Sequence, residues 1–204
     1  MTYRLVMNVT WHPLSDRHIH LPVIGMDWLK PSCNLLMTIA GIWICFYGAI
    51  EGKYLLTSTA AFLLLIAHVS TSKNRMIEAS VIICTGIIGA AIESINLTIG
   101  VYQYISSTEQ FALLPTWIVM MWFFVGTTTR QLFANLSNRF ATTSVTGALI
   151  GTLIYYVAAK MGAIEFSSNN TPFSVIPILL WSLAFPLIIF IGNQFFTINE
   201  PPSS

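Results

Sequence analysis

Six long apolar segments run through the chain, and each has about the length that a helix needs to cross a membrane. Their approximate limits are 33–50, 54–71, 76–100, 113–133, 140–160 and 173–196. A membrane-spanning helix needs about 20 mostly apolar residues, whereas a membrane strand needs about half as many. Backbone polar groups in hydrocarbon must be satisfied internally, so segments of this length predict helices. The expected fold class is all-α, a polytopic membrane helical bundle with six transmembrane helices.

The composition agrees with a membrane location. Only 8% of the 204 residues are charged and 55% are hydrophobic, whereas soluble domains average about 25% charged residues. So few charges cannot cover a water-facing surface. The net charge of +1 provides no basic surface, so we expect membrane lipids and no nucleic acid as partners.

The basic residues predict the orientation of the bundle. With six spans both termini lie on one face, and that face collects seven of the nine Lys and Arg residues: Arg4, Arg17, Lys30, Lys73, Arg75, Arg130 and Arg139. The opposite face has Lys53 and Lys160. Because cytoplasmic loops carry the excess of positive charge, we expect a multi-pass protein of the cell inner membrane with both termini in the cytoplasm.

This orientation divides the chain into three parts. Residues 1–32 are expected to form a loosely ordered cytoplasmic extension, 33–196 the six-helix transmembrane domain, and 197–204 a short cytoplasmic tail. The histidines at 12, 18 and 20 also allow a metal-binding or pH-sensing cluster. Their spacing lacks the i, i+4 geometry that places two side chains on one helical turn, which favours the simple extension.

Glu93 is the most informative single residue, because it lies well inside the third segment, where a carboxylate costs about 2.5–3.5 kcal/mol on insertion scales. Steps of three and four residues place Gly86, Gly89 and Asn96 on the same helical face. Small residues let another backbone approach closely, which would bury Glu93 and Asn96 at a helix contact. Two interpretations remain open: a proton-carrying or substrate-orienting carboxyl, and a hydrogen-bonded glutamate that fixes helix register.

Three further polar residues lie near the cytoplasmic ends of their segments. An antiparallel hairpin would bring His68 and Glu78 close together, and such a pair can shuttle protons. Interfacial side chains also reach water without a partner, and this interpretation is favoured. Arg130 follows three threonines and is expected to be a positive-inside anchor, with a contact to a lipid phosphate as the alternative.

Aromatic residues gather near the outer interface. An aromatic belt accounts for most of them, including Tyr102, Tyr104 and Trp117. The alternative is a hydrophobic pocket for a lipid or polyene, and the expected lining is Trp117, Trp122, Tyr155 and Trp181. In the fifth segment Gly147 and Gly151 have the GxxxG spacing of a helix-packing face.

Catalytic signatures are missing from the sequence. It contains no HExxH, GxSxG, P-loop or dinucleotide fingerprint, which are the motifs that usually reveal chemistry. The cysteines have no zinc-binding spacing. The sequence therefore predicts no metal and no cofactor, and it does not decide whether any reaction is catalysed.

Several stretches together resemble one family. They are NLLMTIAGIW in the first segment, LLIAHV in the second, IGVYQY after the third, and LPTWIVMMWFFVGTTTRQL and GALIGTLIYYVAAKMGA in the fourth and fifth. From Asn34 to about Ile191 the chain resembles bacterial integral membrane proteins grouped as domain of unknown function 2878. It departs at Thr152, where the family favours proline after the glycine, so a kink expected in the fifth helix is predicted to be missing.

The resemblance implies no established activity. The resemblance also implies a genomic context, because genes of such proteins lie beside genes for fatty-acid modification and photo-oxidative stress. This context suggests a lipid-linked role by association alone. The leading hypothesis is a membrane protein that binds or handles a lipid-like molecule, with Glu93 and Asn96 as its polar centre. The alternatives are a proton-coupled small-solute transporter that uses Glu93, and a structural membrane subunit without a site of its own.

Overall fold

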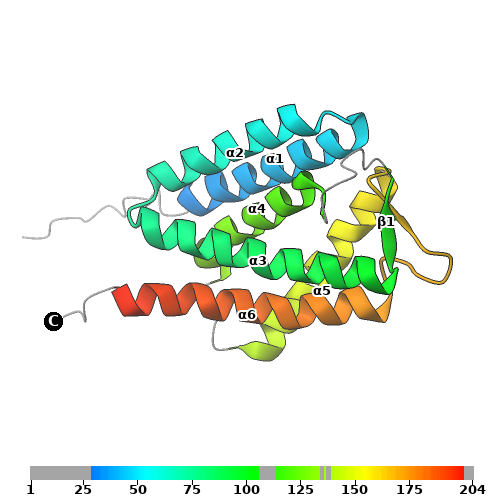
Figure 1. Ribbon diagram of the computed structural model, residues 1–204. Coiled ribbons are helices and arrows are strands. Elements are labelled where there is room, and N and C mark those ends of the chain that lie inside the picture. Colours follow the sequence, from blue (N-terminus) through cyan, green and yellow to red (C-terminus); the bar gives the residue numbers. More distant parts are fainter. Residues whose placement is uncertain (1–28, 106–113, 134–135, 137–138, 200–204) are drawn as a thin grey trace, which may run out of the picture.

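The structure is a computed structural model that describes residues 29–105, 114–133, 136 and 139–199 (Figure 1). Within these ranges there are six helices and two short strands. Their order is α1 (Leu29–Glu51), α2 (Tyr54–Thr71), α3 (Arg75–Ile99), β1 (Tyr102–Tyr104), α4 (Thr116–Phe133), α5 (Phe140–Lys160), β2 (Ile164–Phe166) and α6 (Val175–Asn199). The histidines at 12, 18 and 20 and the last five residues lie outside the described ranges.

Each of the six predicted segments coincides with a helix. Five of the helices, α1, α2, α3, α5 and α6, are long and apolar enough to cross a membrane, whereas the apolar part described for α4 is shorter, Thr116–Thr129. The chain is therefore a multi-pass membrane protein with a helical bundle. Most boundaries agree with the sequence prediction to within two residues. The larger differences are that α1 begins at Leu29, α4 begins at Thr116 and α6 continues to Asn199.

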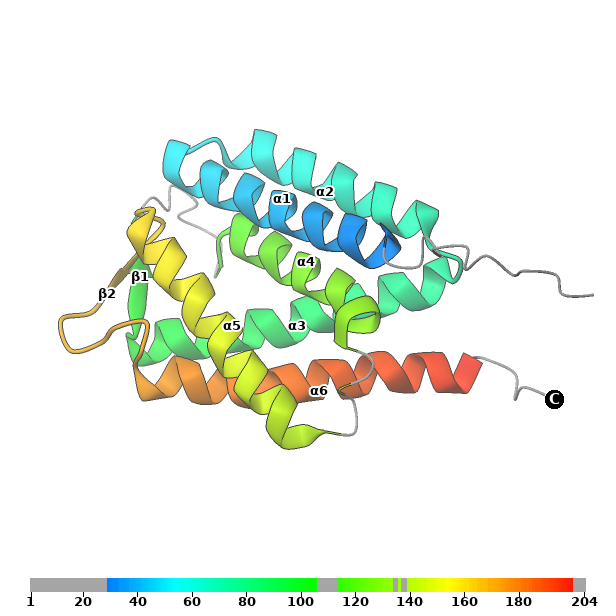
Figure 2. The ribbon, with the colours of Figure 1, turned by 180° about the vertical axis from the view of Figure 1, so that it is seen from behind.

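Helix α4 lies at the centre of the bundle. It packs against α1, α2, α3 and α6, whereas α5 packs chiefly along α6. Both ribbon views show α4 between the α1–α2 pair and the α3–α6 pair, with α5 crossing obliquely (Figures 1 and 2). Met121, Trp122 and Phe124 of α4 are completely buried, so this helix supplies much of the apolar core.

Glycines let aromatic rings sink into neighbouring helices. A Cβ atom on Gly89 would collide with the ring of Trp122, and one on Gly151 would collide with the ring of Trp181. Gly86 receives the ring of Phe123 in the same way, whereas a Cβ atom on Gly147 would collide with the Cβ atom of Phe185 and the backbone oxygen of Trp181. A close backbone approach was expected at these positions. It occurs at Gly147, whereas an aromatic ring takes the space that each of the other three glycines leaves.

Hydroxyl groups on the outer helix faces donate to their own helix. The hydroxyls of Thr59, Thr98 and Thr146 each donate to the carbonyl oxygen four residues earlier, at 2.7–2.9 Å. Ser70 and Ser80 do the same at 2.7 and 2.8 Å. Polar groups that face hydrocarbon need such internal partners.

A small antiparallel sheet closes one end of the bundle. β1 pairs with β2 in the register Tyr102↔Phe166, Gln103↔Glu165 and Tyr104↔Ile164. Gly100 and Gly162 end α3 and α5 with φ values of +74° and +77°, a left-handed conformation that glycine adopts without strain. The sequence predicts helices alone, so this sheet is an addition to the expected fold. We call this end of the bundle the sheet end.

Candidate functional site

The carboxyl group of Glu93 accepts hydrogen bonds from three elements. On one oxygen, Oε1, it accepts the indole N–H of Trp122 at 2.9 Å and the hydroxyl of Tyr155 at 3.1 Å. On the other, Oε2, it accepts the hydroxyl of Tyr102. Glu93 itself is completely buried. The carboxyl group of α3 therefore ties together α4, α5 and β1.

Asn96 extends this group of hydrogen bonds by one helical turn. Its Nδ2 donates to the Tyr155 hydroxyl at 3.0 Å, and that hydroxyl in turn donates to Glu93. Its Oδ1 is buried and has no hydrogen-bond partner among the described groups. Glu93 and Asn96 share one face of α3 because they are three residues apart.

Aromatic rings surround these two polar side chains. Trp122 stacks on Trp181 with 4.4 Å between ring centroids, and Tyr155 meets Trp181 edge-on at 6.3 Å. The ring centroid of Tyr102 lies 5.4 Å from that of Tyr155. We call Glu93, Asn96, Tyr102, Trp122, Tyr155 and Trp181 the Glu93 centre. All of these residues except Tyr102 were expected from the sequence to belong to the polar centre or the pocket lining, and the structure brings them into one cluster.

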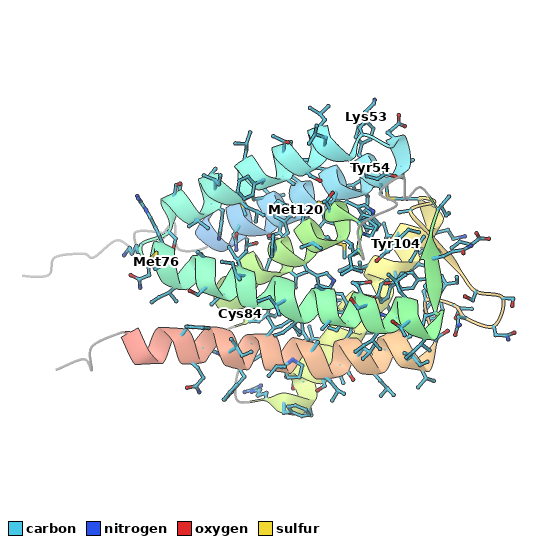
Figure 3. All side chains as sticks on the ribbon, in the orientation of Figure 1. Lys53, Tyr54, Met76, Cys84, Tyr104 and Met120 are labelled. Atoms are coloured by element: carbon cyan, nitrogen blue, oxygen red, sulfur yellow. The ribbon has the colours of Figure 1, made fainter. Side chains whose placement is uncertain are left out.

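Trp117 and Tyr104 form a second layer beside the centre. The ring centroid of Trp117 lies 5.5 Å from that of Tyr104 and 5.9 Å from that of Phe46. Figure 3 shows Tyr104 at the sheet end of the molecule, on the same side as Lys53. Burial, reinforced by the nearby charge of Glu93, raises the pKa of the Tyr104 phenol, so this residue stays protonated and can act as a donor.

The aromatic-belt interpretation is wrong for two of these side chains. A belt residue contacts lipid headgroups, but Tyr102 and Trp117 are each only 2% exposed. Tyr102 instead points its hydroxyl at Glu93. The sequence signal for this role was the pattern Tyr102-Gln103-Tyr104, in which alternate residues face the same side of a strand. A run of three residues is too short to identify a strand by its period.

His68 and Glu78 form a buried pair near the other end of the bundle. The Nε2 of His68 lies 2.9 Å from Oε1 of Glu78, and the two side chains are 8% and 6% exposed. The favoured expectation, that both would reach water without a partner, is therefore wrong. The side chain of Arg130 lies outside the described residues. Within the described ranges, no group of three or more His, Cys, Asp or Glu side chains is arranged to hold a metal ion.

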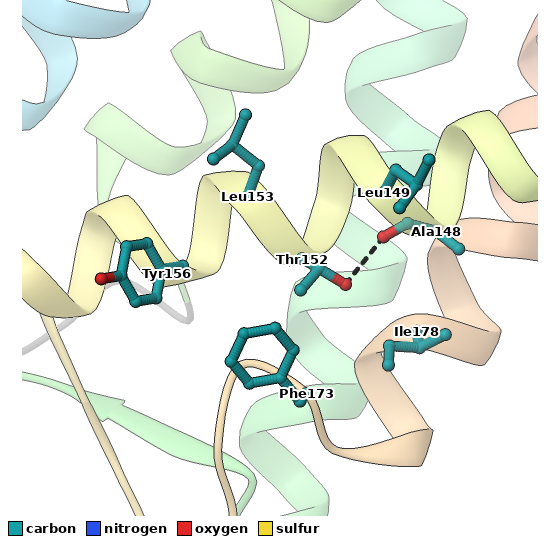
Figure 4. A pocket seen from close by; sticks show the side chains of 7 residues that line it. All are labelled: Ala148, Leu149, Thr152, Leu153, Tyr156, Phe173 and Ile178. Atoms are coloured by element: carbon teal, nitrogen blue, oxygen red, sulfur yellow. Dashed lines mark hydrogen bonds between the residues drawn. The ribbon is translucent and has the colours of Figure 1, made fainter.

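An apolar groove runs along the outer side of α5, separate from the Glu93 centre. It has a volume of about 430 Å³ and is lined by Ala148, Leu149, Thr152, Leu153, Tyr156, Phe173 and Ile178 (Figure 4). The hydroxyl of Thr152, which also lines the groove, donates to the carbonyl oxygen of Ala148 at 2.7 Å. The groove therefore offers an apolar surface along most of its length.

A smaller groove of about 180 Å³ lies on the other side of α5, toward α1. Its lining includes Trp43 and Phe46 of α1 and Ile154 of α5. Leu153 lines both grooves. Helix α5 is thus flanked by apolar grooves on two sides.

Comparison with known proteins identifies a family. The family model described as a protein of unknown function, DUF2878, matches residues 32–187. Neither the curated proteins nor the solved structures contain a match to the chain.

Proposed function

The chain belongs to the DUF2878 family of proteins of unknown function, and we propose that it binds a lipid-like molecule from within the membrane. The observation that carries this proposal is the apolar groove of about 430 Å³ along α5. Small-molecule sites typically have volumes of about 300–1,000 Å³ and mostly apolar walls with few polar groups. A groove of this size that faces hydrocarbon suits an acyl or isoprenoid chain.

The polar end of such a molecule would lie toward the sheet end. Tyr156 lines the groove, and the Lys160 ammonium lies 5.7 Å above the centroid of its ring. One helical turn separates these two residues, and Lys160 is the last residue of α5. This arrangement supports an amphiphile whose chain lies in the groove and whose headgroup lies beside Lys160.

Filling the groove tests the proposal. Leu153→Trp places a bulky ring at the position that lines both grooves. Leu183→Trp is its matched control, because Leu183 lines neither groove. The two leucines are equally exposed, at 61% and 62%. After delipidation in detergent, native mass spectrometry should find a retained lipid on the unmodified chain and on Leu183→Trp, but little on Leu153→Trp. Equal retention by the two variants, or bulk phospholipid alone on all three proteins, would contradict the proposal.

We also propose a specific placement: six spans in a bacterial inner membrane, with both termini in the cytoplasm. The distribution of Lys and Arg supports this placement. The sheet end has Lys53 and Lys160, whereas Lys73, Arg75 and Arg139 lie at or just before the first residues of α3 and α5, at the other end. Single cysteines introduced by Ser72→Cys and Ser168→Cys, in a chain whose native cysteines at 33, 45 and 84 are replaced, test it in intact cells. An impermeant thiol reagent added outside should label position 168 only, and labelling of position 72 alone would reverse the orientation.

A further inference from the structure

The Glu93 centre contains a buried acid whose hydrogen-bond donors are all neutral. They are the indole N–H of Trp122 and the phenol hydroxyls of Tyr102 and Tyr155. In the described part of the chain the ion pairs are Lys53–Glu51 and His68–Glu78, and neither includes Glu93. Buried carboxylates usually pair with a positive charge. The centre is therefore electrostatically suited to a cation.

Asn96 supplies a second acceptor in the same cluster. The residue is completely buried, its Nδ2 bonds to Tyr155, and its Oδ1 has no hydrogen-bond partner among the described groups. A buried acceptor without a partner loses its interaction with water and gains nothing in return. An N–H group from a ligand would satisfy it.

Tyr102 is the one donor to Glu93 that is not on a helix. It belongs to β1, a strand of three residues paired only with β2. Isolated two-stranded sheets are marginally stable, whereas Trp122 and Tyr155 are fixed in long helices. Withdrawal of β1 would remove the Tyr102 hydroxyl from Oε2 of Glu93 and leave the other two donors in place.

We infer that the Glu93 centre is a binding site for a lipophilic amine in its protonated form. The ammonium group takes the position of the Tyr102 hydroxyl at Oε2 of Glu93 and donates a second hydrogen bond to Oδ1 of Asn96. The surrounding rings of Trp122, Trp181 and Tyr155 give the ligand an apolar wall and favour a cation over a neutral molecule. Ca²⁺ and Mg²⁺ need about six or more oxygen ligands, and the donors that point their hydrogens at Glu93 do not provide them.

This inference does not depend on the groove along α5. The two sites share no side chain, because the groove is lined from the outer side of α5 and the Glu93 centre lies in the core. Leu153→Trp is therefore expected to leave amine binding unchanged, so one proposal can fail while the other stands.

Three probes with the same alkyl chain test the ligand class. Purified full-length protein in a neutral detergent is titrated with dodecylammonium, dodecanol and dodecyltrimethylammonium, and binding is followed by calorimetry and tryptophan fluorescence. Dodecanol lacks the charge and the quaternary amine lacks N–H donors. We expect saturable binding of dodecylammonium that is at least about tenfold tighter than that of either other probe. Equal affinity for dodecylammonium and dodecanol would overturn the inference.

Two variants on α3 locate the site. Glu93→Gln removes the negative charge and should weaken dodecylammonium binding at least about tenfold. Glu78→Gln is the matched control, because Glu78 is the other buried glutamate of the same helix, and it should bind as the unmodified protein does. Unchanged binding by Glu93→Gln, or the same loss in Glu78→Gln, would contradict the assignment.

Tyr102→Phe distinguishes a binding site from a purely structural contact. It removes the hydroxyl that competes with the ligand for Oε2 of Glu93, so it should tighten dodecylammonium binding severalfold. A purely structural role predicts lower stability and no gain in affinity. If Glu93→Gln does not fold, Tyr102→Phe and Asn96→Leu decide the question, since the inference requires the first to bind more tightly and the second more weakly.

Discussion

The indole ring of Trp122 occupies the space in which a side chain on Gly89 would begin. Gly89 lies one helical turn before Glu93 on the buried face of α3. The ring that enters this space carries the N–H group that Glu93 accepts at 2.9 Å. The glycine thus sets the distance between α3 and α4 and brings the donor to the acceptor.

Gly89→Ala should destabilise the protein. A Cβ atom at this position collides with Trp122, and such overpacking of a core costs about 1–3 kcal/mol. Gly192→Ala is the control, because the nearest side-chain atom to its added Cβ lies 3.7 Å away, and alanine favours a helix over glycine by about 1 kcal/mol. Unfolding in detergent, followed by tryptophan fluorescence, should show a lower midpoint for Gly89→Ala alone. A midpoint lowered equally in both variants would show that the space at Gly89 is not critical.

Trp122→Phe should lower stability in a way that depends on Glu93. The phenyl ring still fills much of the recess, but the N–H donor is lost, and hydrogen bonds to charged groups contribute about 1.5–3 kcal/mol. A double-mutant cycle with Glu93→Gln measures the part of the loss that belongs to this contact. The pair Trp122→Phe and Glu78→Gln is the control and should be additive. Additivity in the Glu93 cycle as well would mean that the hydrogen bond contributes nothing measurable.

Glu78→Ala should destabilise the end of the bundle opposite the sheet. The change leaves the buried imidazole of His68 without its partner at 2.9 Å, and an unsatisfied buried polar group costs about 1–3 kcal/mol. Glu165→Ala is the control, because Glu165 is exposed and surface substitutions usually change stability by less than about 0.5 kcal/mol. His68→Ala combined with Glu78→Ala should then cost less than the sum of the two single changes. The measurement is again unfolding in detergent, and equal losses for Glu78→Ala and Glu165→Ala would refute the expectation.

The small sheet can be tested by cross-linking. Gln103 and Glu165 are opposite each other in the register of β1 and β2, and their side chains form a hydrogen bond of 3.2 Å. Opposite residues of an antiparallel pair have Cα atoms about 4.5–5.5 Å apart, within the range that a disulfide accepts. The pair Gln103→Cys and Glu165→Cys, in a chain without the native cysteines, should therefore oxidise readily, as seen by mass and gel mobility. Gln103→Cys with Asn169→Cys should not, and efficient oxidation of that second pair would argue against the register.

The sequence predicted the helices well because their signal is local. Long apolar runs identify each span without knowledge of its neighbours, and the expected limits 54–71 and 140–160 are those of α2 and α5. The strands could not be identified in this way. Each has three residues, and what stabilises Tyr102-Gln103-Tyr104 is its pairing with residues about 60 positions later in the chain.

The composition of the site was also partly predictable. Glu93 and Asn96 stood out because polar groups are costly in hydrocarbon, and aromatic residues stood out because they gather near the expected outer interface. The hydrogen-bond partners of Glu93 could not be predicted from the sequence, because Trp122 and Tyr155 lie 29 and 62 positions away from it along the chain. Tyr102 was assigned to the interface because its position next to a helix end fits a belt residue equally well, and only the turn at Gly100 directs it inward.

The hydroxyl groups that donate to their own helices make the outer surface less polar toward lipid than its residue types suggest. Helices α2 and α5 are the least buried of the five candidate spans, and they also have the lowest mean hydropathy, 1.5 and 1.4. Hydropathy scales count each serine and threonine as if water had to solvate it. Where the hydroxyl hydrogen is already committed to a backbone carbonyl, as at Thr59 and Thr146, a surrounding acyl chain meets chiefly methyl and methylene groups. These two helices are therefore more compatible with lipid than their residue content suggests, and hydropathy alone understates how well spans of this kind suit the bilayer.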